Sequence, residues 1–508
     1  MTNCAEVQRN AITNCKNVEN LSEDIYRIDV VNEITEGNLA ERFSKYFKGD
    51  YLYNLDDRSW YSWNKKVWSK NNIVAIKQRY RGFLKILTSQ SKENKRQNIT
   101  KELLRYDGRN KQNNVIEMLL SCEGEHICKG DKFDGKPNLL NFKNGTWDLE
   151  KYKFRVHRKK DYLTKMIMRK YKKNTRPETF EKYMEDTFGR YSSKLRDFMY
   201  EFMGLCLTND VTEQTGFLFY GGGATGKTTF VQILQMLLGE YAVDFASEVL
   251  ALKGNKSMGD IEKQKLRLKG AKLAVVSEAG KHTKYNSEMF KLMTGGDVVQ
   301  GRKNYTDNVD FKPTNKLVIV SNHRIRLDNY EDAEERRMVV IPFDNKVDEA
   351  KRDRRIMEKM ESEYSGILDL AIEGLKRYRE KGKLIYPEEV KQASKEYSEE
   401  FDIIEKFLKV HREELPEEKI KASELYNMYK QWCNDNNYET ESNQEFYRLL
   451  GTKGYPKKIG SGGNNYIFLS KNDNLKNSKN IPSMHRINLM YTSEEFQEHE
   501  SSNMGNAQ

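Results

Sequence analysis

The spacing of apolar residues predicts helices that alternate with short buried strands through the middle of the chain. Residues 178–188 follow Pro177 and predict a helix, because proline is favoured at helix starts. Residues 192–207 place apolar side chains three or four positions apart, the period of an amphipathic helix. Four apolar runs are typical of buried strands: residues 216–220, 272–277, 316–321 and 338–343. This order predicts an α/β fold with an open parallel sheet.

Changes in the pattern divide the chain into six predicted parts. A polar, flexible N-terminus comes first, and a polar tail rich in asparagine and serine comes last, which predicts disorder there. The proposed boundaries are 1–34 for the flexible N-terminus, 35–176 for a mixed α/β domain, 177–345 for the parallel-sheet domain with its leading helices, 346–400 for a charged helical extension, 401–470 for a compact C-terminal domain and 471–508 for the tail.

Aromatic residues at 60–68 predict a β-hairpin with exposed tryptophans. Trp60, Trp63 and Trp68 alternate with polar residues, and Lys65 and Lys66 occupy the turn. Aromatics interleaved with lysines can stack on nucleic-acid bases. Strand residues that cover a small core are the alternative, and the pattern favours it.

Composition narrows the class of protein further. The 508 residues suffice for several domains, and 11% aromatic residues argue against general disorder. The net charge of +11 favours a polyanionic partner such as nucleic acid. We find no apolar run of about 20 residues and no signal-peptide region, so we expect no membrane partner.

Cysteine usage indicates a reducing compartment such as the cytoplasm. Six cysteines spread over this length do not form a disulfide scaffold. Cys122, His126 and Cys128 resemble a metal site only loosely, because no second pair follows at zinc spacing. Ordinary packing residues are the favoured interpretation of this cluster.

The most specific motif is a phosphate-binding loop directly after the apolar run 216–220. It reads Gly221, Gly222, Gly223, Ala224, Thr225, Gly226, Lys227, Thr228, with Thr229 next, and it fits the P-loop pattern completely. Glycines let the backbone wrap around phosphates, and the following helix points its positive end at the anion. We therefore expect ATP at this loop, with Lys227 neutralising the phosphates and Thr228 coordinating Mg²⁺.

Polar residues end the next two strands and supply candidate chemistry. Glu278 follows residues 272–277 and is the candidate general base. Ser277 stands where an aspartate is usual, so Glu278 is also the candidate for contact with the metal. Asn322 follows residues 316–321 and can orient water or contact the γ-phosphate, since ligands sit beyond the carboxyl ends of parallel strands. Arg336 and Arg337 precede the last strand, and a guanidinium of this kind could stabilise transition-state charge on a neighbouring subunit's phosphate.

A glycine-containing segment between these strands predicts a β-hairpin with a basic tip. The tip residues Arg302, Lys303 and Tyr305 could grip a DNA backbone and stack on it in a ring channel. A surface hairpin without a partner is the alternative.

The ordered motifs resemble superfamily 3 helicases, and among them the phage and plasmid primase-helicase family that includes the poxvirus primase-helicase. Residues that carry the resemblance are Lys291, Thr294-Gly-Gly-Asp297, Arg302, Ser321-Asn322 and Asp332-Ala-Glu-Glu-Arg336-Arg337. Upstream, Gly37-Asn-Leu-Ala-Glu-Arg-Phe43, Trp60 with Trp68, Asn141-Phe-Lys-Asn144-Gly145-Thr-Trp-Asp-Leu and Asp161-Tyr-Leu-Thr164 are similar to the family's helicase-associated domain.

The resemblance implies an AAA+-like ATPase at 177–345, preceded by the helicase-associated domain at 35–176. It further implies a ring, usually a hexamer, that moves 3′ to 5′ on single-stranded DNA. Such a ring would unwind forked DNA for replication of a phage, plasmid or integrated element, in the cytoplasm of a bacterial host. Many relatives carry an N-terminal primase, whereas no primase-like set of carboxylates precedes Gly221 here. We therefore expect no primer synthesis by this chain and a separate primase or other replication partner.

The C-terminal domain has the element order of a winged helix: two helices at 422–433 and 443–453, then a hairpin around residues 461–463. It is similar to the C-terminal domain of these helicases. Lys453 would end the second helix, and Lys457 and Lys458 would lie on the wing, where they suit duplex phosphates. A winged helix that docks protein is an equal alternative.

Two rival functions stay open at this point. One is an origin-binding or regulatory protein that uses ATP only as an assembly switch, with little unwinding. The other is a small-molecule P-loop kinase, which the hairpin at residues 302–305 and the C-terminal domain disfavour.

Overall fold

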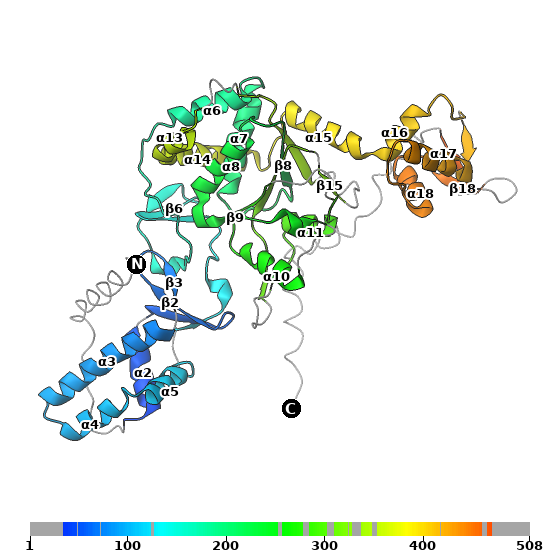
Figure 1. Ribbon diagram of the computed structural model, residues 1–508. Coiled ribbons are helices and arrows are strands. Elements are labelled where there is room, and N and C mark those ends of the chain that lie inside the picture. Colours follow the sequence, from blue (N-terminus) through cyan, green and yellow to red (C-terminus); the bar gives the residue numbers. More distant parts are fainter. Residues whose placement is uncertain are drawn as a thin grey trace, which may run out of the picture. The chain divides into compact units, whose positions relative to one another are not determined.

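The chain is represented by a computed structural model whose elements are drawn in Figure 1. It divides into two compact units, Met1–Tyr397 and Ser398–Gln508, and each is described by itself. The structure describes residues 34–47, 49–71, 73–122, 126–251, 257–277, 284–301, 309–323, 325–327, 337–347, 353–416, 418–459 and 465–469. Within them, no helix is both long and apolar enough to cross a membrane. The predicted flexible N-terminus and C-terminal tail lie almost wholly outside these ranges.

A five-stranded parallel sheet forms the centre of the first unit, which confirms the predicted α/β class. Its strand order is β16-β8-β14-β10-β9, and every pairing is parallel. The central strands are buried on both faces, which explains why they are continuous apolar runs rather than alternating patterns. The strands are β8 (Gly216–Tyr220), β9 (Ala242–Asp244), β10 (Leu273–Val276), β14 (Lys316–Ser321) and β16 (Met338–Pro342).

Helices that precede the first strand of the sheet in sequence and helices that follow its last strand share one hydrophobic core with it. Gly204 of α7 and Gly374 of α14 let the two backbones approach so closely that a Cβ on either would collide with the other helix. The charged segment after residue 346 therefore packs into the same core as the leading helices. These helices are α6 (Glu178–Phe188), α7 (Ser193–Cys206), α8 (Lys227–Leu238), α13 (Ile356–Ser362), α14 (Tyr364–Lys381) and α15 (Glu388–Phe401).

Short elements surround the sheet. The pairs β11 with β15 and β12 with β13 form two small ribbons. The bounds are α9 (Ser247–Leu250), α10 (Met258–Arg267), β11 (Lys284–Tyr285), α11 (Ser287–Gly295), β12 (Val299–Gly301), β13 (Val309–Phe311) and β15 (Arg326–Leu327).

The N-terminal part of the first unit combines a helical layer with a second sheet, ordered β3-β2-β1-β4. Apolar faces of the helices form their own core around Phe43, Tyr80 and Phe83. The elements are α2 (Glu36–Phe47), β1 (Tyr51–Asn54), β2 (Ser59–Trp63), β3 (Trp68–Asn71), α3 (Ile73–Glu93), α4 (Gln97–Arg105), α5 (Arg109–Leu119) and β4 (Ile127–Cys128).

The predicted hairpin at residues 60–68 exists, but the expectation of exposed tryptophans was wrong. Trp60 and Trp68 are 4% and 1% exposed. Trp60 packs edge-on against Tyr53, and Trp68 donates from Nε1 to the Lys159 carbonyl at 3.0 Å. Neighbouring strands and the loop at 159–163 cover both rings, so these indoles serve the core and are unavailable for stacking on bases.

His126 occupies both of its ring nitrogens with protein partners. Nδ1 lies 3.1 Å from Ser44 Oγ, and Nε2 lies 2.7 Å from the Leu119 carbonyl. The described residues contain no group of three or more histidine, cysteine, aspartate or glutamate side chains arranged to hold a metal.

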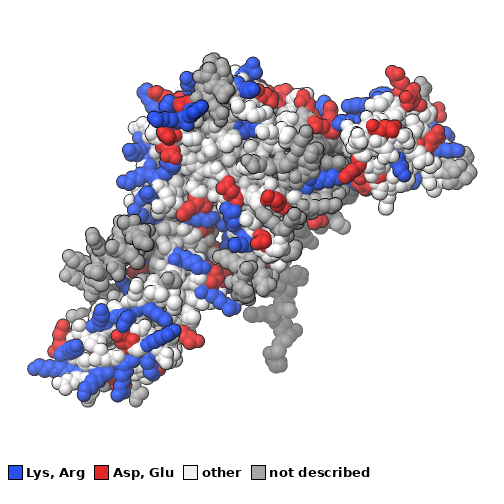
Figure 2. All heavy atoms as spheres, in the orientation of Figure 1, with Lys and Arg blue, Asp and Glu red and all other residues white. Residues whose placement is uncertain are grey.

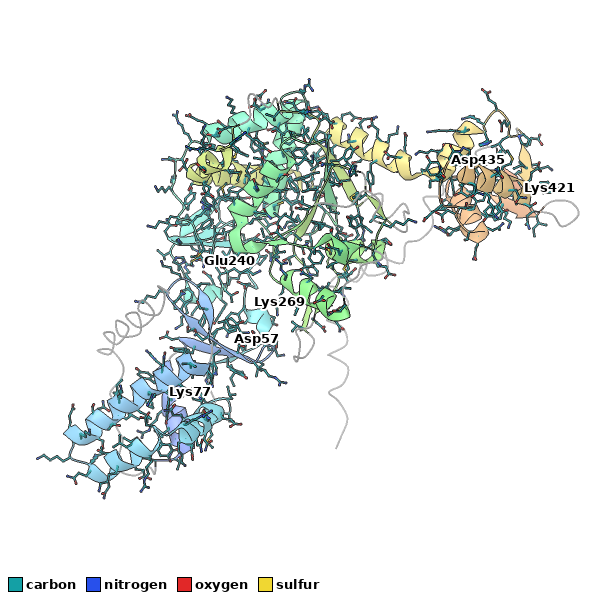
Figure 3. The ribbon with its side chains drawn as sticks, in the orientation of Figure 1. Asp57, Lys77, Glu240, Lys269, Lys421 and Asp435 are labelled. Carbon is teal, nitrogen blue, oxygen red and sulfur yellow. The ribbon has the colours of Figure 1, made fainter. Side chains whose placement is uncertain are left out.

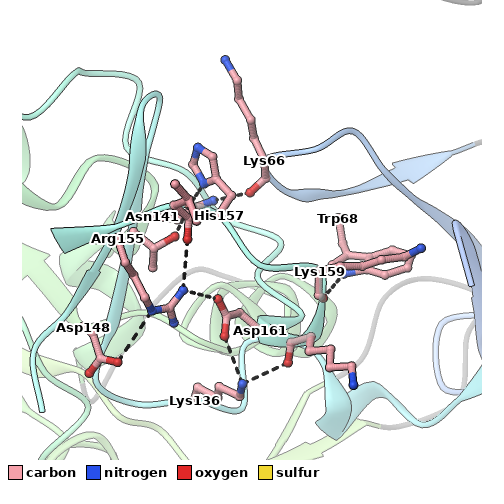
Figure 4. A network of polar contacts seen from close by, with 12 residues as sticks. Lys66, Trp68, Lys136, Asn141, Asp148, Arg155, His157, Lys159 and Asp161 are labelled. Carbon is pink, nitrogen blue, oxygen red and sulfur yellow. Dashed lines mark hydrogen bonds and ion pairs between the residues drawn. The ribbon is translucent and has the colours of Figure 1, made fainter. Parts of the chain in front are cut away.

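Residues that resemble the helicase-associated motifs take part in a partly buried polar network (Figure 4). It joins the three-stranded sheet β5 (Leu139–Phe142), β6 (Gly145–Asp148) and β7 (Lys153–Arg155) to the loop that follows. Asn141 donates to the Lys66 carbonyl at 2.9 Å and accepts from Thr146 at 3.1 Å. Asp161 accepts from Arg155 at 2.8 Å and from Lys136 at 3.0 Å. Burial opposes ionisation, but these two cations hold the pKa of Asp161 below its usual range.

We predict that Asp161→Asn lowers the free energy of unfolding by about 3 kcal/mol, because it leaves Arg155 largely buried without its closest anion. Urea denaturation measures the change. Asp310→Asn, an exposed aspartate on β13, is the matched control. Equal stability of the two variants would contradict a structural role for the network.

Two buried lysines begin adjacent strands of the parallel sheet. Lys272 Nζ donates to the Pro137 carbonyl at 2.7 Å, and Lys316 Nζ donates to the Thr208 and Asp210 carbonyls. Both lie at the amino edge of the sheet and are 2% and 4% exposed. Burial disfavours the charged ammonium, so it lowers the pKa of Lys316 to about 8.

This shift predicts a pH dependence of stability. The folded-state pKa lies below the unfolded value, so the unfolded chain binds more protons between these values and the wild-type free energy of unfolding rises with pH. Between pH 7.5 and 9.5, the free energy of unfolding of the wild type should rise by about 2 kcal/mol more than that of Lys316→Met. Urea titrations at both pH values measure it. The exposed Lys312→Met control should keep the wild-type rise, and a parallel pH response of wild type and Lys316→Met would refute the assignment.

The second unit contains helices and a small antiparallel sheet of order β17-β19-β18. Its core gathers apolar residues around Phe407, Tyr429 and Phe446. The elements are α16 (Ile403–Val410), β17 (Lys419–Lys421), α17 (Ala422–Asp435), α18 (Asn443–Thr452), β18 (Lys457–Ile459) and β19 (Asn465–Phe468).

Candidate nucleotide-binding site

The glycine-rich loop leaves the sheet directly after β8 and leads into α8. Gly221 has φ +155°, and a Cβ there would collide with the Phe343 carbonyl. Gly226 has φ +90° and precedes the first residue of α8. These positions need glycine for conformation and space. Around Gly222 and Gly223 a Cβ would meet nothing within 4 Å, so this backbone lies open for a phosphate.

Lys227 holds its ammonium inside the loop. Nζ donates to the Gly221 carbonyl at 2.9 Å and to Thr225 Oγ1 at 3.2 Å, and the residue is 5% exposed. Burial lowers the pKa of Lys227, an effect that the charge of Asp344 opposes. A phosphate beside this ammonium would supply the anionic partner that a buried cation needs.

The loop opens into a cleft of about 2050 Å³ at the carboxyl edge of the sheet. Parallel register brings the ends of β8, β14 and β10 together there. Ser277 and Asn322 line the cleft with Thr228, and Asn322 is exposed to it. His323 donates its backbone N–H to Ser321 Oγ at 3.0 Å, which fixes the turn that carries Asn322.

Residues from α6, from α13 and from the turn that precedes α13 also line the cleft, and sequence reasoning missed them. Tyr183 donates its hydroxyl to the Gly226 carbonyl at 2.8 Å, and burial raises the pKa of Tyr183. Lys182, Arg354 and Met357 also line the cleft. Only the helical period of 178–188 pointed toward this contact, because neither helix carries a nucleotide motif.

Several predicted site residues lie outside the described residues. Glu278 is one of them, although its neighbour Ser277 lines the cleft. Arg302, Lys303, Tyr305 and Arg336 are also outside. The described stem of the predicted hairpin pairs Val299 with Phe311 and Gly301 with Val309 in antiparallel register.

Arg337 lies at the edge of the sheet opposite the glycine-rich loop. It precedes β16, which pairs in parallel with β8 from Met338 opposite Gly216. Arg337 is therefore level with Thr215, and at about 3.3 Å per residue the strand separates it from the level of Gly221 by about 20 Å. Arg337 therefore does not line its own chain's cleft. Arg337 Nη1 lies 3.5 Å from the Lys291 carbonyl. Gly295 is also close, because a Cβ added there would lie 3.1 Å from Arg337 Nη1 and 3.3 Å from Asp297 Oδ2.

Lys457 and Lys458 lie on β18 of the second unit and are exposed. Lys457 Nζ lies 4.2 Å from the centre of the Tyr447 ring, and Lys458 Nζ lies 5.3 Å from that of Phe468. Lys453 caps α18 and forms an ion pair with Asp402.

A P-loop at the carboxyl edge of a parallel sheet defines a P-loop protein of the α/β class. In a comparison with family models, residues 40–189 match the family described as "D5 N terminal like". Residues 219–337 match a family of unknown function, DUF5906. The second match runs from the end of β8 to Arg337.

Relatives of this chain are viral proteins named as candidate helicases. Helicase L207/L206 of Acanthamoeba polyphaga mimivirus is 24% identical over 380 residues, which cover 69% of this chain and 39% of the relative. Helicase 121R of Invertebrate iridescent virus 3 is 22% identical over 498 residues, covering 82% and 51%. The chain thus spans about two-fifths to half of the length of these relatives.

Among solved structures, the apo structure of the NrS-1 C terminal region (305–718) aligns with a TM-score of 0.47 at 12% identity. It covers 86% of this chain and 99% of that one. A second structure of the same region has a TM-score of 0.48 at 12% identity and covers 85% and 100%.

These matches support the resemblance seen in the motifs: the chain is similar to viral proteins named as helicases, and residues 40–189 and 219–337 each match a family model.

Proposed function

We propose that this chain is the ATP-driven motor of a ring-forming DNA helicase that moves 3′ to 5′ on single-stranded DNA. The observation that carries the proposal is the placement of two motifs on opposite edges of one sheet. The P-loop opens at the carboxyl edge, and Arg337 lies at the amino edge beside Lys291 and Gly295. An arginine so placed can meet a nucleotide only on another copy of the chain.

In this proposal the loop backbone at Gly222–Ala224 binds the β-phosphate of ATP, and Lys227 neutralises the β- and γ-phosphates. Mg²⁺ at the Thr228 hydroxyl supplies charge neutralisation at the phosphate oxygens. Asn322 orients the attacking water, and Glu278 accepts its proton. Arg337, with Arg336, stabilises the negative charge that develops on the neighbour's γ-phosphate.

DNA contacts in this proposal come from two basic elements. The hairpin built on β12 and β13 carries Arg302, Lys303 and Tyr305 into the ring channel, where they grip one strand. The second unit acts as a winged helix, since its helices and β17-β19-β18 sheet follow that order, with Lys457 and Lys458 on duplex phosphates. A separate primase is the expected replication partner.

We predict that Lys227→Ala abolishes ATP-dependent strand displacement on forked DNA and lowers ATP turnover at least 100-fold, because it removes the cation that neutralises the phosphates. The exposed Lys151→Ala variant is the control and should unwind normally. A non-hydrolysable ATP analogue should support no displacement.

Two outcomes of that experiment argue against the proposal. Unchanged unwinding by Lys227→Ala would sink the site assignment. ATP-dependent DNA binding by the wild type without displacement would instead support the rival function, an ATP-switched origin-binding protein.

We predict that Arg337→Ala keeps nucleotide affinity within about threefold but lowers ATP turnover by about 10³-fold, as loss of an arginine finger does. Mixing it with Lys227→Ala should partly restore turnover, because each variant supplies the group that the other lacks. Coupled ATPase measurements on the mixture test this, with Arg337→Lys as a control for packing beside Lys291. Failure of every mixing ratio to exceed the separate variants would exclude action between subunits.

A further inference from the structure

The positive charge of the chain is concentrated in one short segment. Residues 73–111 contain eleven lysines and arginines against Glu93, Glu102 and Asp107, a net charge of +8. The whole chain has a net charge of +11, so the other 469 residues together contribute +3. The segment comprises α3, α4 and the start of α5, and it includes neither the hairpin at 302–305 nor β18.

The fold directs these charges outward. Ile76, Tyr80, Phe83, Leu84 and Leu87 of α3 are buried in the helical core. The basic residues occupy the remaining surface of the helices, and Figure 2 shows lysine and arginine gathered over this part of the molecule. Figure 3 labels Lys77 on α3.

Basic residues on α3 form a row rather than a scatter. At 3.6 residues per turn, Lys77, Arg81, Lys85 and Lys92 fall within about 80° of the helix circumference. The row is about 22 Å long at a rise of about 1.5 Å per residue. Like charges at i, i+4 weaken a helix by about 0.2–0.5 kcal/mol per pair, so folding alone does not favour this row.

Most of these cations are not neutralised within the protein. Arg81 pairs with Asp107 at 2.9 Å, and Lys111 pairs with Glu36. Five of the cations form no ion pair within the described ranges: Lys77, Lys85, Lys92, Lys101 and Arg105. All of them except Lys77 are exposed. We call these five residues the basic face.

We propose that the basic face binds the phosphodiester backbone of nucleic acid, as a contact separate from the ATP-driven motor. On α3, Lys77, Lys85 and Lys92 follow one another at intervals of about two helical turns, or about 11 Å, close to the separation of every third phosphate at about 3.4 Å per nucleotide along one strand. Membrane binding would need an apolar helix face turned to lipid, whereas the apolar face of α3 is buried in the core. Contacts of this kind are independent of sequence and weaken with salt.

The test compares two quadruple variants of the full chain without nucleotide. Lys77, Lys85, Lys92 and Lys101 are changed to glutamine in one, and Lys151, Lys153, Lys170 and Lys383 in the control, so both lose four charges. Fluorescence anisotropy measures binding of a labelled oligothymidylate and of a labelled duplex over a KCl series. We expect the basic-face variant to bind at least 10-fold more weakly at low salt. Its slope of log affinity against log salt should be about 3 units shallower on the single strand, since each contact contributes about 0.7.

Comparison of the two probes decides which form of nucleic acid the basic face contacts, because the loss should be greater for that form. Equal affinity and slope for both variants would overturn the proposal. Loss of binding to phosphatidylserine vesicles with unchanged oligonucleotide binding would overturn it as well. Lys227→Ala should bind the oligonucleotide like the wild type, and the basic-face variant should keep DNA-independent ATP turnover, so failure here is distinguishable from failure of the motor proposal.

Discussion

The close approach between the Gly221 backbone and the Phe343 carbonyl is the constraint on which the site depends. Strand β8 has a parallel partner on each side, so the chain can leave the sheet only by turning sharply after Tyr220. Glycine at 221 permits the turn with the end of β16 in contact, and the loop then folds back over Lys227. The P-loop therefore derives its shape from the sheet as much as from its own residues.

Polarity of the sheet separates the chemistry of the two edges. The carboxyl edge gathers the P-loop, Ser277 and Asn322 around one cleft, and the amino edge holds Arg337 with the buried Lys316. Parallel strands cannot bring both edges to one ligand within a chain. A catalytic role for Arg337 therefore requires a second copy of the chain, so ATP hydrolysis that uses Arg337 depends on assembly.

Motifs that resemble the helicase-associated domain have a structural role in the described residues. Asn141 connects the small sheet to the tryptophan hairpin through the Lys66 carbonyl, Thr146 holds Asn141, and Asp161 holds Arg155 of β7. The apolar residues around them join the core of the parallel sheet. The helical N-terminal part instead has its own core and carries most of the net charge. Within residues 35–176, the portion with the small sheet thus extends the core of the parallel sheet, whereas the helical portion supplies most of the net charge.

The sequence by itself determined the P-loop and four of the five strands of the parallel sheet, because continuous apolar runs and glycine spacing are local signals; it missed the short edge strand β9. It could not determine which side chains surround the nucleotide cleft, since Tyr183 and Met357 arrive on helices without a motif. It also misjudged Trp60 and Trp68, because alternation predicts two faces but not which face a neighbouring segment covers. Tertiary structure alone decided the place of Arg337 and the basic face on α3 and α4, because both depend on how strands and helices pack across distant parts of the chain.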